Sequence, residues 1–192
     1  RFDGNSEYFS GKGASRPGLV WESNFIPDIV NLDLHEFSVK GPGLRQVEME
    51  LSSNTLSSHL NDSPVGVYKK AHRHGPGAYI IVLAGRGYTL MWREGEKWAR
   101  FDWGPGSMMS PPNRWFHQHF NLGKEHIRQL ALKGWGQKYP IGGWEQMFKS
   151  TEKGGDMIEF EDEDPAIRAK YVEELKKEGL ELKNLPVNYR KG

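Results

Sequence analysis

Two pairs of histidines in this sequence have a spacing that would let them bind one metal ion. His72 and His74 are separated by a single residue, and so are His117 and His119. Residues two apart on a β-strand point to the same face, so each pair can direct two imidazole rings into one space. Neutral imidazole is a common ligand for iron, zinc, copper and nickel. A polar pair on a strand face has the same spacing, so the residues around the pairs must decide between the two interpretations.

Alternating apolar residues and short turns predict strands around these histidines. Apolar residues occupy every second position of 45–51, which is the pattern of a half-buried strand. Further strands are expected at 65–72, 78–83, 88–92, 98–101, 107–110, 115–121 and 127–133. Turns rich in glycine and proline separate them, and about eight short strands at this spacing predict a sandwich or barrel.

The two flanks differ from this central region. Residues 1–40 predict an arm, whose irregularly placed apolar residues would pack on the body or on a neighbouring subunit. Residues 141–192 predict an extension with one amphipathic helix at about 165–178, capped by Asp164, with Pro165 at its first position and Gly179 after its end. The acidic run 159–164 before this helix is expected to be a solvated linker.

The histidine pairs lie within two longer patterns that resemble the two motifs of the cupin superfamily. The first pattern has the motif spacing throughout, at Gly66, His72, His74, Ala78 and Gly85. The second also keeps its spacing, at Gly106, Pro112, Arg114, His117 and Asn121. Two positions depart from the family: Ala78 replaces a glutamate and Arg114 replaces a glycine. The resemblance covers about 44–133.

This resemblance implies an all-β fold, an antiparallel jelly-roll (cupin) barrel over 41–140, with a divalent metal on His72, His74 and His117. The methyl group of Ala78 cannot bind a metal, so a neutral face of three nitrogens would remain, with positions open for a chelating substrate and dioxygen. The sequence leaves open whether Glu48, Glu50 or His119 supplies a fourth ligand. Glu48 and Glu50 lie on the polar face of the first strand, which is otherwise expected to be wet.

Cupin families with three histidine ligands include the gentisate and salicylate ring-cleaving dioxygenases and the thiol dioxygenases. Residues 115–119 are similar to the second-motif region of the gentisate type. That similarity implies that His119 acts beside the substrate as an acid, a base or an orienting group. Arg114 and Trp115 are the expected substrate-binding residues, although Arg114 would equally suit an exposed loop. The isolated histidines are interpreted as surface or structural residues: His35, His59 and His126.

Composition excludes several classes of protein and partner. The 192 residues suit one domain, and 26 basic against 25 acidic residues leave a formal charge of +1, which gives no bulk attraction for nucleic acid or an anionic membrane. The absence of cysteine excludes disulfides, thiolate metal sites and a cysteine nucleophile. No apolar run approaches the ~20 residues of a membrane helix. A cytoplasmic location is therefore expected, and a homodimer too, because the arm and the helix offer more covering surface than one barrel needs.

The favoured function is a metal-dependent cupin enzyme, an Fe(II)-dependent dioxygenase that acts on a small, flat or aromatic organic acid. One alternative is a lyase, isomerase or decarboxylase in which zinc, manganese or nickel acts without a redox change. Another alternative is a non-catalytic cupin that binds a small ligand.

Overall fold

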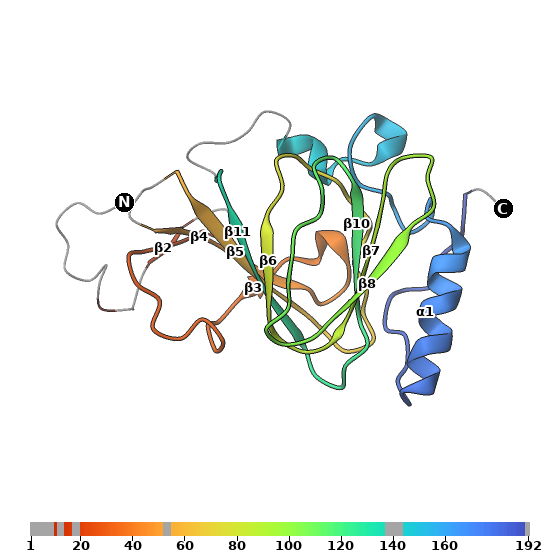
Figure 1. Ribbon diagram of the computed structural model, residues 1–192, viewed down its shortest axis with the longest axis horizontal. Helices are drawn as coiled ribbons and strands as arrows, with labels where there is room; N and C mark the ends of the chain where they lie inside the picture. The colour runs from red at the N-terminus through yellow and green to blue at the C-terminus, as the bar shows by residue number, and fades with distance from the viewer. Residues whose placement is uncertain (1–9, 11–13, 17–19, 52–54, 137–143, 191–192) are drawn as a thin grey trace.

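Two β-sheets contain most of the regular secondary structure in the described part of the chain. The computed structural model describes residue 10 and residues 14–16, 20–51, 55–136 and 144–190. The larger sheet runs β1-β2-β4-β5-β11-β6-β9, with β3 also paired to β4, and the smaller sheet runs β10-β7-β8 (Figure 1). The strands of the larger sheet are β1 (Ala14–Arg16), β2 (Val20–Ser23), β3 (His35–Glu36), β4 (Arg45–Leu51), β5 (Ser57–Ser63), β6 (Tyr79–Ala84), β9 (Met108–Met109) and β11 (Ile127–Lys133). Those of the smaller sheet are β7 (Gly87–Trp92), β8 (Ala99–Trp103) and β10 (Phe116–Asn121).

Helices are short apart from one near the end of the chain. The short 3-10 helices are η2 (Ser38–Lys40), η3 (Trp144–Phe148) and η4 (Thr151–Lys153), and the α-helix is α1 (Pro165–Lys177). A mostly β fold with one α-helix in the described residues confirms that part of the prediction. The two sheets do not close into a complete ring of hydrogen-bonded strands in the described residues, so the jelly-roll barrel and its domain boundaries stay predictions.

Most of the expected strands are present, with three differences. β4 and β11 have the predicted bounds, whereas β5 was not predicted because its sequence, SSHLNDS, lacks an apolar alternation. Residues 65–72 were expected as a strand but form only isolated bridges to β10, at Tyr68–Phe120 and His72–His117. β2 lies in the arm, where no strand was predicted, and it pairs with β4 in parallel.

On β4 and β5, the apolar face of the larger sheet points away from the pocket that the two sheets enclose. Val47 and Met49 of β4 and Leu60 of β5 are buried in a cluster with residues of the arm. The arm contributes the partly buried side chains Trp21, Ile26, Ile29 and Leu32. The expected packing of the arm on the body is therefore observed. The alternate residues of β4 and β5 face inward, where Glu48 is 6% exposed, so the expectation that this face is wet was wrong.

Helix α1 covers the outer face of the smaller sheet (Figure 1). Asp164 caps it by accepting a hydrogen bond from the amide of Ala166 (2.9 Å), and Pro165 lies in its first turn, as predicted. Its buried residues, Ile167, Tyr171 and Leu175, pack against aromatic and aliphatic side chains of the sheet and of the bridged segment. Those partners are Tyr68, Tyr88, Leu90, Phe120 and Leu122.

The acidic run before α1 is not a solvated linker as expected. Glu163 is 6% exposed, and its carboxylate accepts hydrogen bonds from the Tyr68 hydroxyl and from the Gln118 amide (3.0 Å). Glu159 forms an ion pair with Lys70. The run therefore joins the C-terminal extension to the strand residues next to the histidines.

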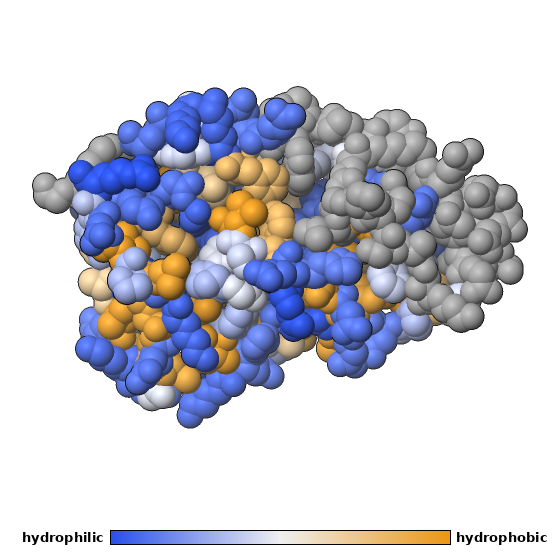
Figure 2. Space-filling view, turned by 180° about the vertical axis from the view of Figure 1, so that it is seen from behind, coloured by the Kyte–Doolittle hydropathy of each residue, from blue (hydrophilic) through white to orange (hydrophobic). Residues whose placement is uncertain are grey.

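The surface shows apolar patches separated by hydrophilic residues on the face seen from behind (Figure 2). Because the arm and α1 both pack within the chain, the covering surface that suggested a homodimer is used internally. The homodimer stays a prediction. No helix in the described residues combines the length and the apolar character that a membrane span requires.

Tyr171 of α1 connects the two backbone segments that carry the histidines. Its hydroxyl lies 2.6 Å from the carbonyl oxygen of Asn121 and 3.2 Å from that of Val67. We expect Tyr171→Phe to lower the free energy of unfolding by about 1–3 kcal/mol, because a buried carbonyl would lose its donor. Urea unfolding followed by circular dichroism measures this loss. Tyr79→Phe is the control, since Tyr79 is 60% exposed and should change stability by less than ~0.5 kcal/mol. Equal effects of the two substitutions would contradict this role of Tyr171.

Candidate metal centre

Backbone pairing places His72 directly opposite His117. The amide of His72 donates to the carbonyl of His117 (3.1 Å), and the amide of His117 donates to the carbonyl of His72 (2.9 Å). Two residues that exchange both hydrogen bonds in this way form a close antiparallel pair whose side chains share a face. His74 follows His72 by two residues, so its ring can reach the same space.

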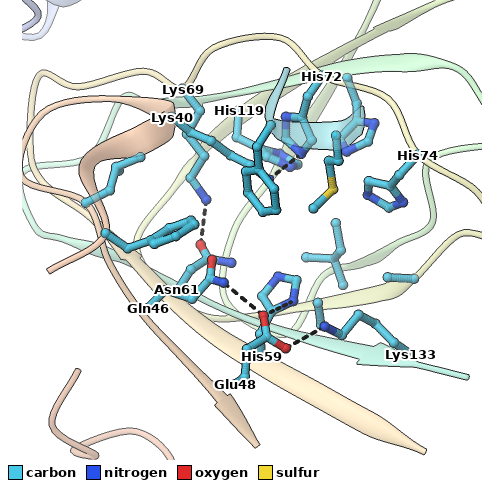
Figure 3. Close-up of a pocket in the computed structure, with 18 of the residues that line it drawn as sticks. Lys40, Gln46, Glu48, His59, Asn61, Lys69, His72, His74, His119 and Lys133 are labelled. Atoms are coloured by element: carbon cyan, nitrogen blue, oxygen red, sulfur yellow. Dashed lines mark hydrogen bonds and ion pairs between the residues drawn. The ribbon is translucent and has the colours of Figure 1, made fainter. Parts of the chain in front are cut away.

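The three imidazole rings line one pocket between the sheets, and Figure 3 labels His72 and His74 there. Ring centroids lie 4.4 Å apart for His72 and His117, 4.9 Å for His74 and His117, and 5.8 Å for His72 and His74. Each ring offers one nitrogen, and the three nitrogens all lie within 4.8 Å of one another. The structure thus brings together the three residues that the sequence nominated as ligands, in a geometry that could hold one metal ion.

Hydrogen bonds on the far side of two rings orient them toward this point. Nδ1 of His72 lies 3.2 Å from the carbonyl oxygen of Lys70, and Nδ1 of His117 lies 3.2 Å from that of Trp115. A ring that donates its Nδ1 proton to a carbonyl presents the lone pair of Nε2, as metal-binding histidines usually do. Nδ1 of His74 is buried with no hydrogen-bond partner in the described residues. These donors fit a divalent transition metal.

Burial keeps the imidazoles neutral. Desolvation lowers the pKa of His72 and that of His117 well below 6.5, and it lowers the pKa of His74 to about 4. The rings therefore do not need to lose a proton at neutral pH before they bind a metal. Lys40 contacts the same group, with its Nζ 2.9 Å from Nε2 of His72.

No carboxylate among the described residues belongs to the three-histidine group. Ala78, at the position of the family's glutamate, is buried and lines the pocket. Glu48 also lines the pocket, but its oxygens accept hydrogen bonds from Lys133 Nζ (2.6 Å) and Gln46 Nε2 (2.9 Å). Glu50 is buried and is not among the residues that line the pocket. The donor set seen here is therefore three neutral nitrogens.

His119 lines the same pocket and is oriented by Thr89, its cross-strand partner on β7. The Thr89 hydroxyl accepts a hydrogen bond from Trp103 Nε1 (2.9 Å) and lies 2.7 Å from Nδ1 of His119. The hydroxyl proton has a better acceptor in this nitrogen than in the Met109 sulfur at 3.4 Å. We infer that Nδ1 accepts and that Nε2 carries the ring proton. In this tautomer His119 is a hydrogen-bond donor rather than a fourth ligand.

Arg114 and Trp115 lie outside the group of residues that line the pocket. Arg114 has a φ of 65°, the left-handed conformation that suits the glycine of the cupin motif. Its guanidinium forms two hydrogen bonds with the carboxylate of Asp156, at 2.6 and 2.8 Å. The guanidinium carbon of Arg93 lies over the Trp115 ring, 5.1 Å from the centroid of that ring. Substrate binding by Arg114 and Trp115 stays a prediction that these contacts do not support.

Eight polar residues among the described lining of the pocket were not nominated from the sequence, namely Lys40, Arg45, Gln46, His59, Asn61, Asp62, Lys69 and Lys133. His59 was interpreted as a surface or structural residue, yet it lines the pocket with its Nδ1 3.7 Å from Glu48. Lys133 ends β11, and its side chain is 1% exposed. The signal was weak: polar residues at alternate positions of adjacent strands give no sign of which face is enclosed.

No protein-family model matches the chain, and no curated protein matches it either. Solved structures do match. The Schizosaccharomyces pombe Cnp3 cupin domain is 13% identical over 55% of this chain and 69% of that one, with a TM-score of 0.45. A Bacillus subtilis oxalate decarboxylase, studied for its Mn(II) centres, is 16% identical over 62% of this chain, with a TM-score of 0.47, and the match spans only 33% of that protein. A cupin 2 conserved barrel domain protein from Rhodopseudomonas palustris is 18% identical over 46% of this chain and 59% of that one, with a TM-score of 0.40.

The solved structures that resemble the chain are thus cupin-fold proteins. The match covers about a third of the length of the decarboxylase. At these identities and scores, the activities of those proteins carry no conclusion about this one.

The convergence of the rings generates a direct test of metal binding. Protein purified without added metal should contain about one divalent transition metal per chain, and His72→Ala or His117→Ala should lose most of it, because each removes one of three nitrogen ligands. Elemental analysis by mass spectrometry measures the content. His35→Ala is the matched control, since His35 is exposed on β3 and should keep the wild-type content. Equal metal content in all of these proteins would contradict the site.

Proposed function

We propose that this chain is a metal-dependent cupin enzyme that acts on a small organic acid, with Fe(II)-dependent dioxygenation as its reaction. The observation that carries the proposal is the convergence of three neutral imidazoles in an enclosed pocket that also contains lysines. Zinc, manganese and nickel suit the same nitrogen donors, so the donor set does not identify the metal and a measurement of the reaction must do so.

Charge favours an acid as the substrate. Three neutral nitrogens leave the two positive charges of a divalent metal uncompensated, and the nearby Lys40 adds another cation. A carboxylate would neutralise part of this charge, and a second oxygen of the same molecule would allow chelation. The apolar lining of Phe37, Trp135 and Phe148 suits a flat or aromatic carbon skeleton.

The residues of the pocket would have separate roles in this reaction. His72, His74 and His117 would hold the metal, and Fe(II), when bound, would supply redox chemistry and open coordination positions. His119 would donate a hydrogen bond from its Nε2–H to a substrate oxygen, while Thr89 keeps its ring in that tautomer. Burial lowers the pKa of His119 well below 6.5, which keeps the ring neutral and lets Nδ1 act as an acceptor.

Anaerobic reconstitution with Fe(II) followed by measurement of oxygen uptake tests the reaction. We expect oxygen uptake with at least one compound among catechols, hydroxybenzoates and small thiols. We expect His117→Ala to abolish this uptake. His35→Ala should retain the wild-type rate. Absence of uptake from Fe(II)-loaded protein across the three substrate classes would contradict the dioxygenase proposal.

A lyase, isomerase or decarboxylase without redox change is the second candidate. Lys40 favours it, because an ammonium group beside the metal ligands would stabilise a carboxylate or an enolate without electron transfer. Turnover of the same acids by zinc-loaded protein under strict anaerobiosis would support this candidate against the first. Ligand binding that survives His117→Ala, without turnover under either condition, would instead indicate a non-catalytic cupin.

The tautomer of His119 gives a further prediction. Thr89→Val keeps the shape of the side chain but removes the hydroxyl that holds Nδ1, so we expect kcat to fall by about 10–100-fold with unchanged metal content. Steady-state kinetics and elemental analysis measure the two quantities. Thr89→Ser, which restores the hydroxyl, should recover most of the rate. A normal kcat in Thr89→Val would show that this hydrogen bond does not position His119 for the reaction.

A further inference from the structure

The pocket contains more basic groups than carboxylates. Among the described residues, four lysine and arginine side chains line it, and they are Lys40, Arg45, Lys69 and Lys133. Two carboxylates of the described residues line it, those of Glu48 and Asp62. Charged groups are costly to bury unless each has a partner. The ion pairs among these six residues therefore decide which basic groups of the pocket lack a carboxylate partner.

Two of the basic residues have their carboxylate in place. Lys133 lies 2.6 Å from a Glu48 oxygen, and Arg45 lies 3.2 Å from an Asp62 oxygen. The other oxygen of Asp62 lies 2.7 Å from Nδ1 of His126. Both carboxylates of the lining are therefore engaged, on the side of the pocket formed by β4, β5 and β11.

Lys40 and Lys69 have only neutral partners in the described residues. Lys69 Nζ donates to the side-chain oxygen of Asn61 (2.6 Å), and Lys40 Nζ contacts the His72 ring (2.9 Å). Lys69 is 6% exposed. Desolvation lowers the pKa of Lys69 to about 7, and the attraction of Asp62, which is itself paired with Arg45, offsets this shift only in part.

Both lysines lie on the side of the pocket that holds His72 and His119 (Figure 3). The amine of Lys69 projects from there toward the opposite wall, where Asn61 lies. A molecule held at the three histidines would thus have these two ammonium groups next to it. A second anionic group on that molecule would meet Lys69 in a dry environment, where such an ion pair is stronger than in water.

We propose that Lys69, assisted by Lys40, binds a second carboxylate of the substrate, so that the pocket selects small dicarboxylates over monocarboxylates. This inference rests on the proposed function, in which the first carboxylate is held at the metal. Lys69 would act in recognition, and Asn61 would hold its amine in place.

Calorimetric titration of zinc-loaded and of metal-free protein tests the selection, with malonate and succinate as dicarboxylates and acetate and propionate as monocarboxylates. At least one dicarboxylate should bind wild-type protein ten or more times more tightly than the matched monocarboxylate. Lys69→Met should remove most of this preference while changing monocarboxylate affinity less than twofold. Lys124→Met, at an exposed lysine, should keep the full preference.

Lys69→Arg keeps the charge and should retain part of the preference, and thermal melting checks that each variant is folded. Equal binding of dicarboxylates and monocarboxylates to wild-type protein would overturn the inference, whether or not Lys69→Met folds. An undiminished preference in folded Lys69→Met would overturn it as well.

The two proposals fail in different ways. Failure of the metal centre alone would leave a Lys69-dependent preference that is the same with and without zinc. Failure of this inference alone would leave zinc bound through His72 while the two classes of acid bind equally well.

Discussion

The mutual backbone hydrogen bonds between His72 and His117 fix the geometry on which the candidate site depends. Side chains alternate between faces along a strand, so a shift of one residue in this pairing would turn one ring away from the other. The pairing of β10 with β7 places His119 opposite Thr89, which sets the orientation of its ring. Tyr171 and Glu163 hold this region from outside, through hydrogen bonds to the backbone at Asn121 and to the side chain of Gln118.

Much of the hydrophobic core lies outside the pocket. Val47 and Leu60 of the larger sheet face the arm, and Tyr88 and Phe120 of the smaller sheet face α1. Each sheet thus has an apolar layer on its outer side, and a smaller cluster of Val82, Ile127 and Trp103 joins the two sheets. The inner faces are then free to carry Glu48, whose pairing with Lys133 offsets the cost of burying both charges.

Local patterns predicted the parts of this structure that depend on neighbouring residues. The alternation of 45–51 gave the bounds of β4, and Asp164 with Pro165 gave the start of α1. The spacing of the two motifs correctly nominated His72, His74 and His117 as neighbours in space. Strand periodicity alone did not pair the two stretches, because His72 and His74 lie outside the named strands; the resemblance to the cupin motifs nominated them together with His117.

What the sequence did not reveal depends on which side of a sheet becomes enclosed. A strand with one apolar and one polar face has the same sequence pattern whether the polar face meets water or a pocket, and so Glu48 was assigned to the wrong environment. β5 was missed because its sequence, SSHLNDS, lacks an apolar alternation. The role of Arg114 was obscured by its backbone, because an arginine with a φ of 65° serves the turn while its guanidinium pairs with Asp156, 42 residues away.

The separation of the apolar layers from the pocket has a consequence for how such a chain diverges. Gln46 and Asn61 point into the pocket, whereas Val47 and Leu60, their neighbours in sequence, point toward the arm. Exchange of the first two would alter which molecules are accepted and leave the packing of the strands intact. Alternate residues of the same strands thus serve recognition and stability, so substitutions can change the pocket residues without changing the residues that pack the strands.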